Sequence, residues 1–155
     1  MSKKGIAVVT ALMIGLLLTG CGEDPELAKF KVNFENFCIN LSTLDTAINN
    51  IDAKSENASD QLITYIDQMD RQFQALAALD FPEEFKYLEE LSEEASEYMS
   101  EAADSYAKAY ANDTFNQAMS DYAYKNYKRA YKRIQLILIY LHGDEPQDED
   151  LISDQ

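Results

Sequence analysis

The sequence predicts an all-α protein, an up-down-up-down four-helix bundle with left-handed, coiled-coil-like packing. Apolar residues recur every three or four positions in four separate segments, which is the signature of amphipathic helices. Short polar links join these segments, and no strand-like alternation lies between them. Helices are expected at about residues 25–53, 58–79, 82–110 and 115–142. Two helical hairpins associating as a dimer are an alternative, and the pattern leaves the oligomeric state open.

The first predicted helix has the most regular apolar pattern. Asp24 can cap its free amides, and Pro25 is tolerated at the first helical position. Spacings of three and four then alternate along one stripe: Leu27, Phe30, Phe34, Phe37, Leu41, Leu44, Ile48 and Ile51. Such a narrow stripe suits nearly parallel helix packing with a slight left-handed twist.

The other three helices carry similar stripes. In the second helix the stripe is Leu62, Ile66, Met69, Phe73 and Leu76, and Pro82 separates this helix from the third. The third helix is expected to face inward through Phe85, Leu88, Leu91, Ala95, Tyr98 or Met99, Ala102 and Tyr106. In the fourth helix the expected inward residues are Phe115, Met119, Tyr122, Asn126, Ala130, Ile134, Ile137 and Leu141. Gly143 is expected to end this helix, and residues 143–155 read as an acidic disordered tail.

The N-terminus has the layout of a secretory signal. Lys3 and Lys4 precede an uncharged apolar run, Ile6 to Leu18, which is too short to cross a membrane. The string Leu18-Thr19-Gly20-Cys21 follows it and resembles the lipobox of bacterial lipoproteins. An ordinary secretory signal with a chance cysteine is the alternative interpretation.

This resemblance implies that residues 1–20 are removed and that the Cys21 sulfur carries a diacylglyceryl group with fatty acids such as palmitate. Residues 21–24 would then form a lipid-anchored N-terminus on the outer face of the cell membrane. Two acyl chains make a stable anchor where one would be marginal. With its helical pattern, the chain resembles small helical-bundle lipoproteins of Gram-positive bacteria, a resemblance that implies no activity.

Composition narrows the possible partners. Removal of residues 1–20 leaves 11 of the 13 basic residues against all 28 acidic ones, a formal net charge of −17. Such a charge disfavours nucleic acid and anionic lipid surfaces as ligands. With Cys21 acylated, Cys38 has no intramolecular partner, so no disulfide framework is expected.

Residue types needed for catalysis or metal binding are sparse. The single histidine, His142, is predicted at a helix end, and the chain has no Cys-x-x-Cys motif and no Gly-rich phosphate loop. Paired glutamates such as Glu83-Glu84 point about 100° apart on a helix and fit a solvated face. We therefore expect a non-enzymatic protein without metal or cofactor.

One segment has the composition of a binding surface. Tyrosines alternate with basic residues between Tyr122 and Arg133, which we call the basic-aromatic segment. Its candidate partner-binding residues are Tyr124, Lys125, Lys128, Arg129, Tyr131 and Lys132. The segment could instead pair with the third helix, since residues 83–104 carry a net charge of −8 and residues 115–141 a net charge of +4.

The function expected from these features is that of a lipid-anchored, extracytoplasmic helical protein that binds another envelope protein. The alternative is binding of a small molecule or cell-wall polymer in a groove between helices. A cavity lined by the tyrosines of the third helix would favour the alternative, whereas an exposed basic-aromatic patch would favour a protein partner.

Overall fold

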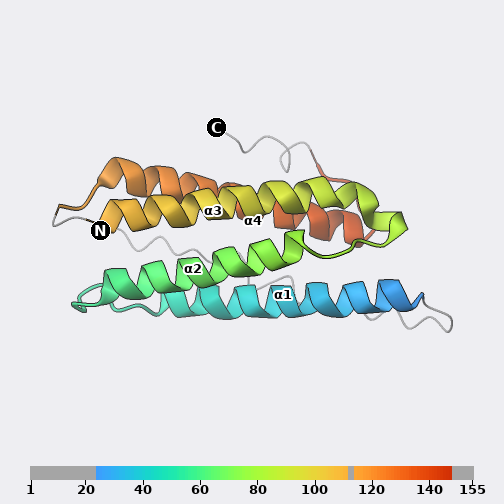
Figure 1. Cartoon of the computed structure of the whole chain (residues 1–155), viewed down its shortest axis with the longest axis horizontal. Coiled ribbons are helices and arrows are strands. Elements are labelled where there is room, and N and C mark those ends of the chain that lie inside the picture. Colours follow the sequence, from blue (N-terminus) through green and yellow to red (C-terminus); the bar gives the residue numbers. More distant parts are fainter. Residues whose placement is uncertain (1–23, 112–113, 148–155) are drawn as a thin grey trace.

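The computed structural model describes residues 24–111 and 114–147, and within these residues the chain is helical without strands. Figure 1 shows the long helices lying along one axis, each running opposite to the helix before it. Their bounds are α1 Pro25–Asn49, α2 Ala58–Ala77, a short 3-10 helix η1 Glu83–Leu88, α3 Glu89–Tyr110 and α4 Gln117–Leu141. The predicted all-α four-helix bundle is confirmed.

Side-chain and backbone hydrogen bonds set the helix ends near the predicted positions. The carboxylate of Asp24 accepts a hydrogen bond of 2.9 Å from the amide of Glu26, which caps α1. At its other end α1 stops at Asn49, four residues earlier than expected. The Asp52 carboxylate there accepts a hydrogen bond of 3.0 Å from the Lys54 amide and so favours a turn. Gly143 ends α4 with a φ of 79°, a left-handed conformation that only glycine adopts at little steric cost.

The third predicted helix is divided into η1 and α3. The amide of Phe85 donates to the Pro82 carbonyl at 2.8 Å, an i to i+3 hydrogen bond that winds this turn more tightly than an α-helix. Three residues per turn bring Phe85 and Leu88 to the same side, where Leu88 is fully buried and Phe85 packs against the core. The tight turn therefore closes one end of the bundle.

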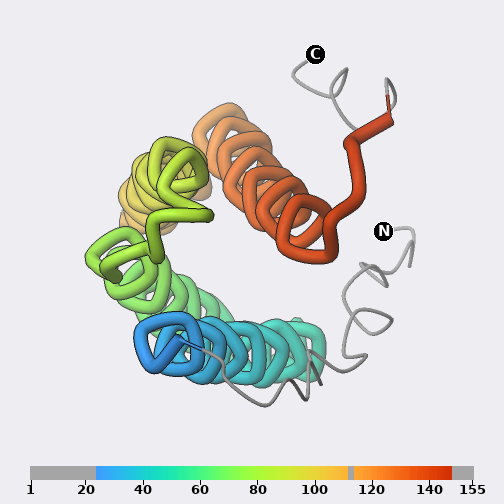
Figure 2. Tube along the Cα trace, turned by 90° about the vertical axis from the view of Figure 1, so that its right-hand side faces the viewer, coloured from blue at the N-terminus to red at the C-terminus, as the bar shows by residue number. Residues whose placement is uncertain are grey.

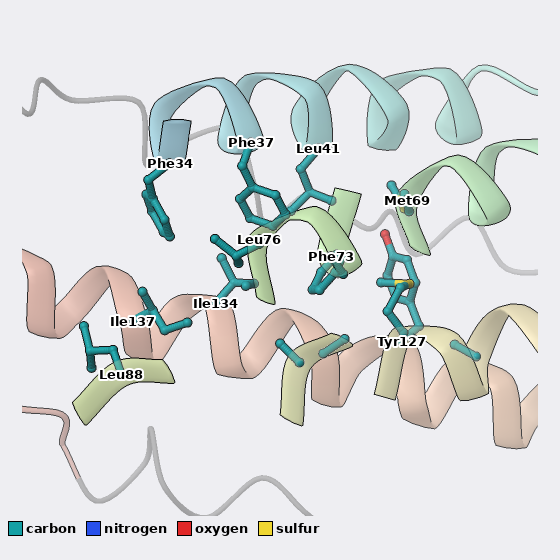
Figure 3. Close-up of a cluster of buried hydrophobic side chains, with 14 of the residues drawn as sticks. Phe34, Phe37, Leu41, Met69, Phe73, Leu76, Leu88, Tyr127, Ile134 and Ile137 are labelled. Atoms are coloured by element: carbon teal, nitrogen blue, oxygen red, sulfur yellow. The ribbon is translucent and has the colours of Figure 1, made fainter. Parts of the chain in front are cut away.

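The predicted stripes on α1 and α2 form the centre of the core. Phe34, Phe37 and Leu41 of α1 interlock with Met69, Phe73 and Leu76 of α2, all of them buried (Figure 3). The rings of Phe37 and Phe73 meet edge to face with centroids 5.4 Å apart. This arrangement favours aromatic pairs beyond the burial of their area.

Small side chains let α3 and α4 approach each other more closely than any other pair of helices. Buried residues of α3 include Ser92, Ala95, Ala102, Ser105 and Ala109, and α4 buries Ala123 and Ala130. Met99 is fully buried, and Tyr98 lies half-buried beside it. Ser92 and Ser105 were not predicted to face inward, because hydroxyl residues carry little apolar signal.

Helices α1 and α4 complete the bundle with less intimate packing. Seen from the end, the helices follow one another in sequence order, with α1 and α4 farther apart than consecutive helices (Figure 2). Bulky side chains rather than close backbone contacts therefore connect these two helices, among them Tyr127 of α4, which donates a hydrogen bond to Asp45 of α1.

Candidate functional site

The basic-aromatic segment occupies the middle of α4. The side chain of Asn116 caps this helix by accepting a hydrogen bond of 3.1 Å from the Met119 amide. The buried residues of α4 are Ala123, Asn126, Tyr127, Ala130, Ile134, Leu136 and Ile137. Because successive residues turn by about 100°, the opposite side of the same segment faces solvent.

Two tyrosines and two lysines form an exposed group on this solvent side. Tyr122 is 47% exposed and Tyr124 is 40% exposed, and both Lys125 and Lys128 are exposed. The ammonium nitrogen of Lys128 lies 5.2 Å from the centroid of the Tyr124 ring, within the range of a cation–π interaction. We call these four residues the helix-four surface. The expectation that Tyr122 faces inward is wrong, because Ala123 takes the inward position next to it.

The arginines of the segment turn toward α3. The guanidinium carbons of Arg129 and Arg133 lie 5.4 and 5.3 Å from the centroid of the Tyr98 ring. Arg133 also donates from Nε to the Glu94 carboxylate at 2.5 Å. Partly exposed ion pairs of this kind stabilise a protein by roughly 0–1 kcal/mol. The two interpretations of the segment thus apply to different residues, since its arginines pair with α3 while Lys125 and Lys128 face outward.

Lys132, the remaining basic candidate, is half-exposed. It follows Lys125 and Lys128 by seven and four residues, and therefore continues the same side of the helix. It lies beside the helix-four surface, but its side chain is less exposed than those of Lys125 and Lys128.

The two remaining tyrosines of the segment lie inward. The hydroxyl of Tyr127 donates a hydrogen bond of 2.8 Å to the Asp45 carboxylate, and the hydroxyl of Tyr131 donates to the Met69 sulfur at 3.9 Å. Figure 3 shows Tyr127 among the core side chains. Burial raises the pKa of both phenols, most strongly for Tyr127. Tyr131 was expected to supply outer contact area, but it packs against the core instead.

A sequence signal for this buried bond existed in α1. Asp45 follows Leu41 by four residues and precedes Ile48 by three, so it lies on the apolar stripe, and its side chain is only 7% exposed. A carboxylate at such a position needs a hydrogen-bond donor from another element. Nothing local identified the donor, because Tyr127 is 82 residues away in the sequence.

The remaining reactive groups are isolated. His142 is exposed at the C-terminal end of α4. Among the described residues, no three His, Cys, Asp or Glu side chains come together in a group that could hold a metal ion. The thiol of Cys38 is half-buried, and burial, with the nearby charge of Glu35, raises its pKa from 9.0 to about 11. At neutral pH this thiol stays protonated and packs as a small apolar group.

Comparison with known proteins found no matching family model, no matching curated protein and no matching solved structure. None of the described helices combines the length and the apolar character needed to cross a membrane. Cys21, the predicted lipidation site, lies outside the described residues, as do residues 1–20 and most of the predicted tail.

Proposed function

We propose that the protein is an extracytoplasmic lipoprotein, tethered to the membrane through Cys21, that binds another envelope protein without catalysing a reaction. The helix-four surface is the observation that carries this proposal. Its tyrosines supply rigid contact area, and Lys125 and Lys128 supply charge beside them. Tyrosine is enriched at protein interfaces, because its ring packs while its hydroxyl forms hydrogen bonds.

The place of this surface in the bundle supports a protein partner. Helix α1 begins at Pro25, four residues after Cys21, and four extended residues span at most about 14 Å. A lipid on Cys21 would hold this end of the bundle, where α4 also ends, close to the membrane (Figure 1). Lys125 and Lys128 lie 16 and 13 residues before Leu141, which is about 20–24 Å along the helix axis. The surface would therefore face a partner beyond the lipid headgroups.

Charge removal tests the role of the surface. We expect the double variant Lys125→Gln, Lys128→Gln to form no cross-link to the partner in intact cells. Its free energy of unfolding should stay unchanged, because both lysine side chains are exposed. Glutamine preserves helix propensity. The matched control is Lys54→Gln, Lys108→Gln, which removes the same charge at exposed positions elsewhere. An unchanged cross-linking profile in the first variant would refute the proposed surface.

Replacement of Cys21 tests the anchor separately. We expect Cys21→Ser to abolish both incorporation of a labelled fatty acid and acyl-dependent retention in the membrane fraction, because serine has no sulfur to receive the lipid. Cys38→Ser is the control, since it removes the other cysteine and should leave both properties intact. A labelled Cys21→Ser protein would place the lipid elsewhere.

One observation favours the alternative function, binding of a small ligand between helices. An apolar cavity lies between the start of α1, η1 and the end of α4, far along the bundle from Lys125 and Lys128. It is not lined by the tyrosines of α3. The apolar walls of this cavity favour an apolar ligand.

A further inference from the structure

The apolar cavity at the end of the bundle where α1 begins has a volume of about 160 Å³. Its walls are Leu27, Phe30, Lys31, Phe34, Glu84, Phe85 and Leu141. Five of these residues are large and apolar, and the two charged ones come from α1 and η1. Cavities of about 150 Å³ with aliphatic and aromatic walls stay dry and take up apolar ligands such as benzene.

Aromatic packing keeps this cavity preformed. The Phe30 ring stacks on Phe85 with centroids 6.2 Å apart, and it also contacts Phe81 at 4.8 Å and Phe34 at 5.9 Å. Phe30 and Phe34 are almost fully buried, whereas Leu27, Phe85 and Leu141 are only half-buried. The inner wall is thus rigid, and the half-buried residues leave an entrance.

The chemistry of the walls selects an alkyl chain as ligand. A sugar or peptide would bury polar groups against the apolar side chains of Phe30, Phe34 and Leu141, and an unpaired buried polar group is unfavourable by several kcal/mol. A methylene chain has no such groups and gains from each methylene removed from water.

We propose that the occupant is the end of one acyl chain of the protein's own anchor on Cys21, an inference that rests on the lipid attachment proposed above. Pro25 lies four residues from Cys21, within about 14 Å of extended chain, and Leu27 of the wall is two residues further. A short tether gives the attached chain an effective concentration in the millimolar range. A chain from another lipid has no such advantage.

Occupation of the cavity would change how firmly the protein is held. A single acyl chain left in the bilayer gives only marginal, reversible binding, whereas two give a stable anchor. The cavity would therefore weaken retention and allow the protein to exchange between membranes or leave them.

Tryptophan fluorescence can report on this cavity, because the chain has no tryptophan of its own. The variant Phe85→Trp places an indole in the wall, and Leu141→Trp is a second reporter if the first does not fold. The control Ile51→Trp lies just beyond the other end of α1, whose 25 residues span about 37 Å. Each purified lipoprotein is measured before and after lipase removes its ester-linked acyl chains, with mass spectrometry confirming the acyl content.

Brominated dodecanoate, which quenches indole on contact, is the probe. We expect no quenching of Phe85→Trp before lipase treatment, saturable loss of its fluorescence after treatment, and no quenching of Ile51→Trp in either state. Absence of quenching after lipase would show that the cavity takes no alkyl chain. If Phe85→Trp is quenched equally before and after lipase treatment, although the untreated protein carries its acyl chains, the acyl chain of the anchor does not occupy the cavity. Quenching of the untreated protein by brominated phospholipid vesicles would assign the cavity to a membrane lipid instead.

Failure of the anchor itself has a different signature. A purified protein without acyl mass would refute lipid attachment at Cys21, and with it occupation of the cavity by the anchor. The response of Phe85→Trp to free brominated dodecanoate would still show whether the cavity accepts an alkyl chain.

Discussion

The buried hydrogen bond between Tyr127 and Asp45 should be the main polar link between α4 and α1. Both side chains are 7% exposed, and the donor and acceptor oxygens are 2.8 Å apart. A hydrogen bond to a charged group contributes about 1.5–3 kcal/mol. Tyr127→Phe removes only the hydroxyl, so we expect it to lower the free energy of unfolding by about 2 kcal/mol. That is a large share of the roughly 5–15 kcal/mol of a typical domain.

A double-mutant cycle separates this bond from other effects of the substitutions. Tyr127→Phe, Asp45→Ala and the double variant are compared by urea unfolding, followed by far-ultraviolet circular dichroism near neutral pH. Asp45→Ala alone should also destabilise, because it leaves the Tyr127 hydroxyl buried without its acceptor. We expect a coupling energy of about 1.5 kcal/mol or more. A coupling energy below about 0.5 kcal/mol would show that the bond does not hold α1 against α4.

Two further predictions concern α1. Phe37→Ala should lower the free energy of unfolding by roughly 3–5 kcal/mol, because the Phe37 ring is only 5% exposed and packs against Phe73. A loss below about 1 kcal/mol in urea unfolding would contradict this packing. Burial raises the pKa of the Cys38 thiol from 9.0 to about 11. The contribution that this shift makes to the free energy of unfolding is fully present below pH 9 and is lost as the pH rises toward 11. Between pH 8 and 10 the native chain should therefore lose about 1 kcal/mol more than Cys38→Ala, and parallel profiles would refute this.

The four long helices, and those of their ends that have a local cause, could be predicted from the sequence. A stripe of spacing three and four places Phe34, Phe37 and Leu41 on one side of α1 whatever lies against them, and the structure buries all three. The cap at Asp24 and the left-handed turn at Gly143 likewise depend only on neighbouring backbone. The 3-10 winding of η1 was not predicted, because it depends on how Phe85 and Leu88 pack against the core.

The candidate site could be predicted only as a segment. Tyrosine is apolar along its ring and polar at its tip, so its type alone does not show whether it faces inward. Tyr124 and Tyr131 are seven residues apart, yet only Tyr124 is exposed. The difference arises because Met69 and Phe73 of α2 pack against Tyr131, whereas the Tyr124 side chain stays 40% exposed.

The sequence by itself determined the helical class, the cap at Asp24, the helix end at Gly143, the apolar stripes and the acidic balance, because each depends on residue type and short-range spacing. Only the tertiary structure decided which cations of α4 pair with α3, which acceptor Tyr127 meets, and where three elements leave an apolar cavity. Those features depend on how far each helix is rotated and shifted against its neighbours. That fit is the outcome of packing among side chains distant in the chain, and no local pattern encodes it.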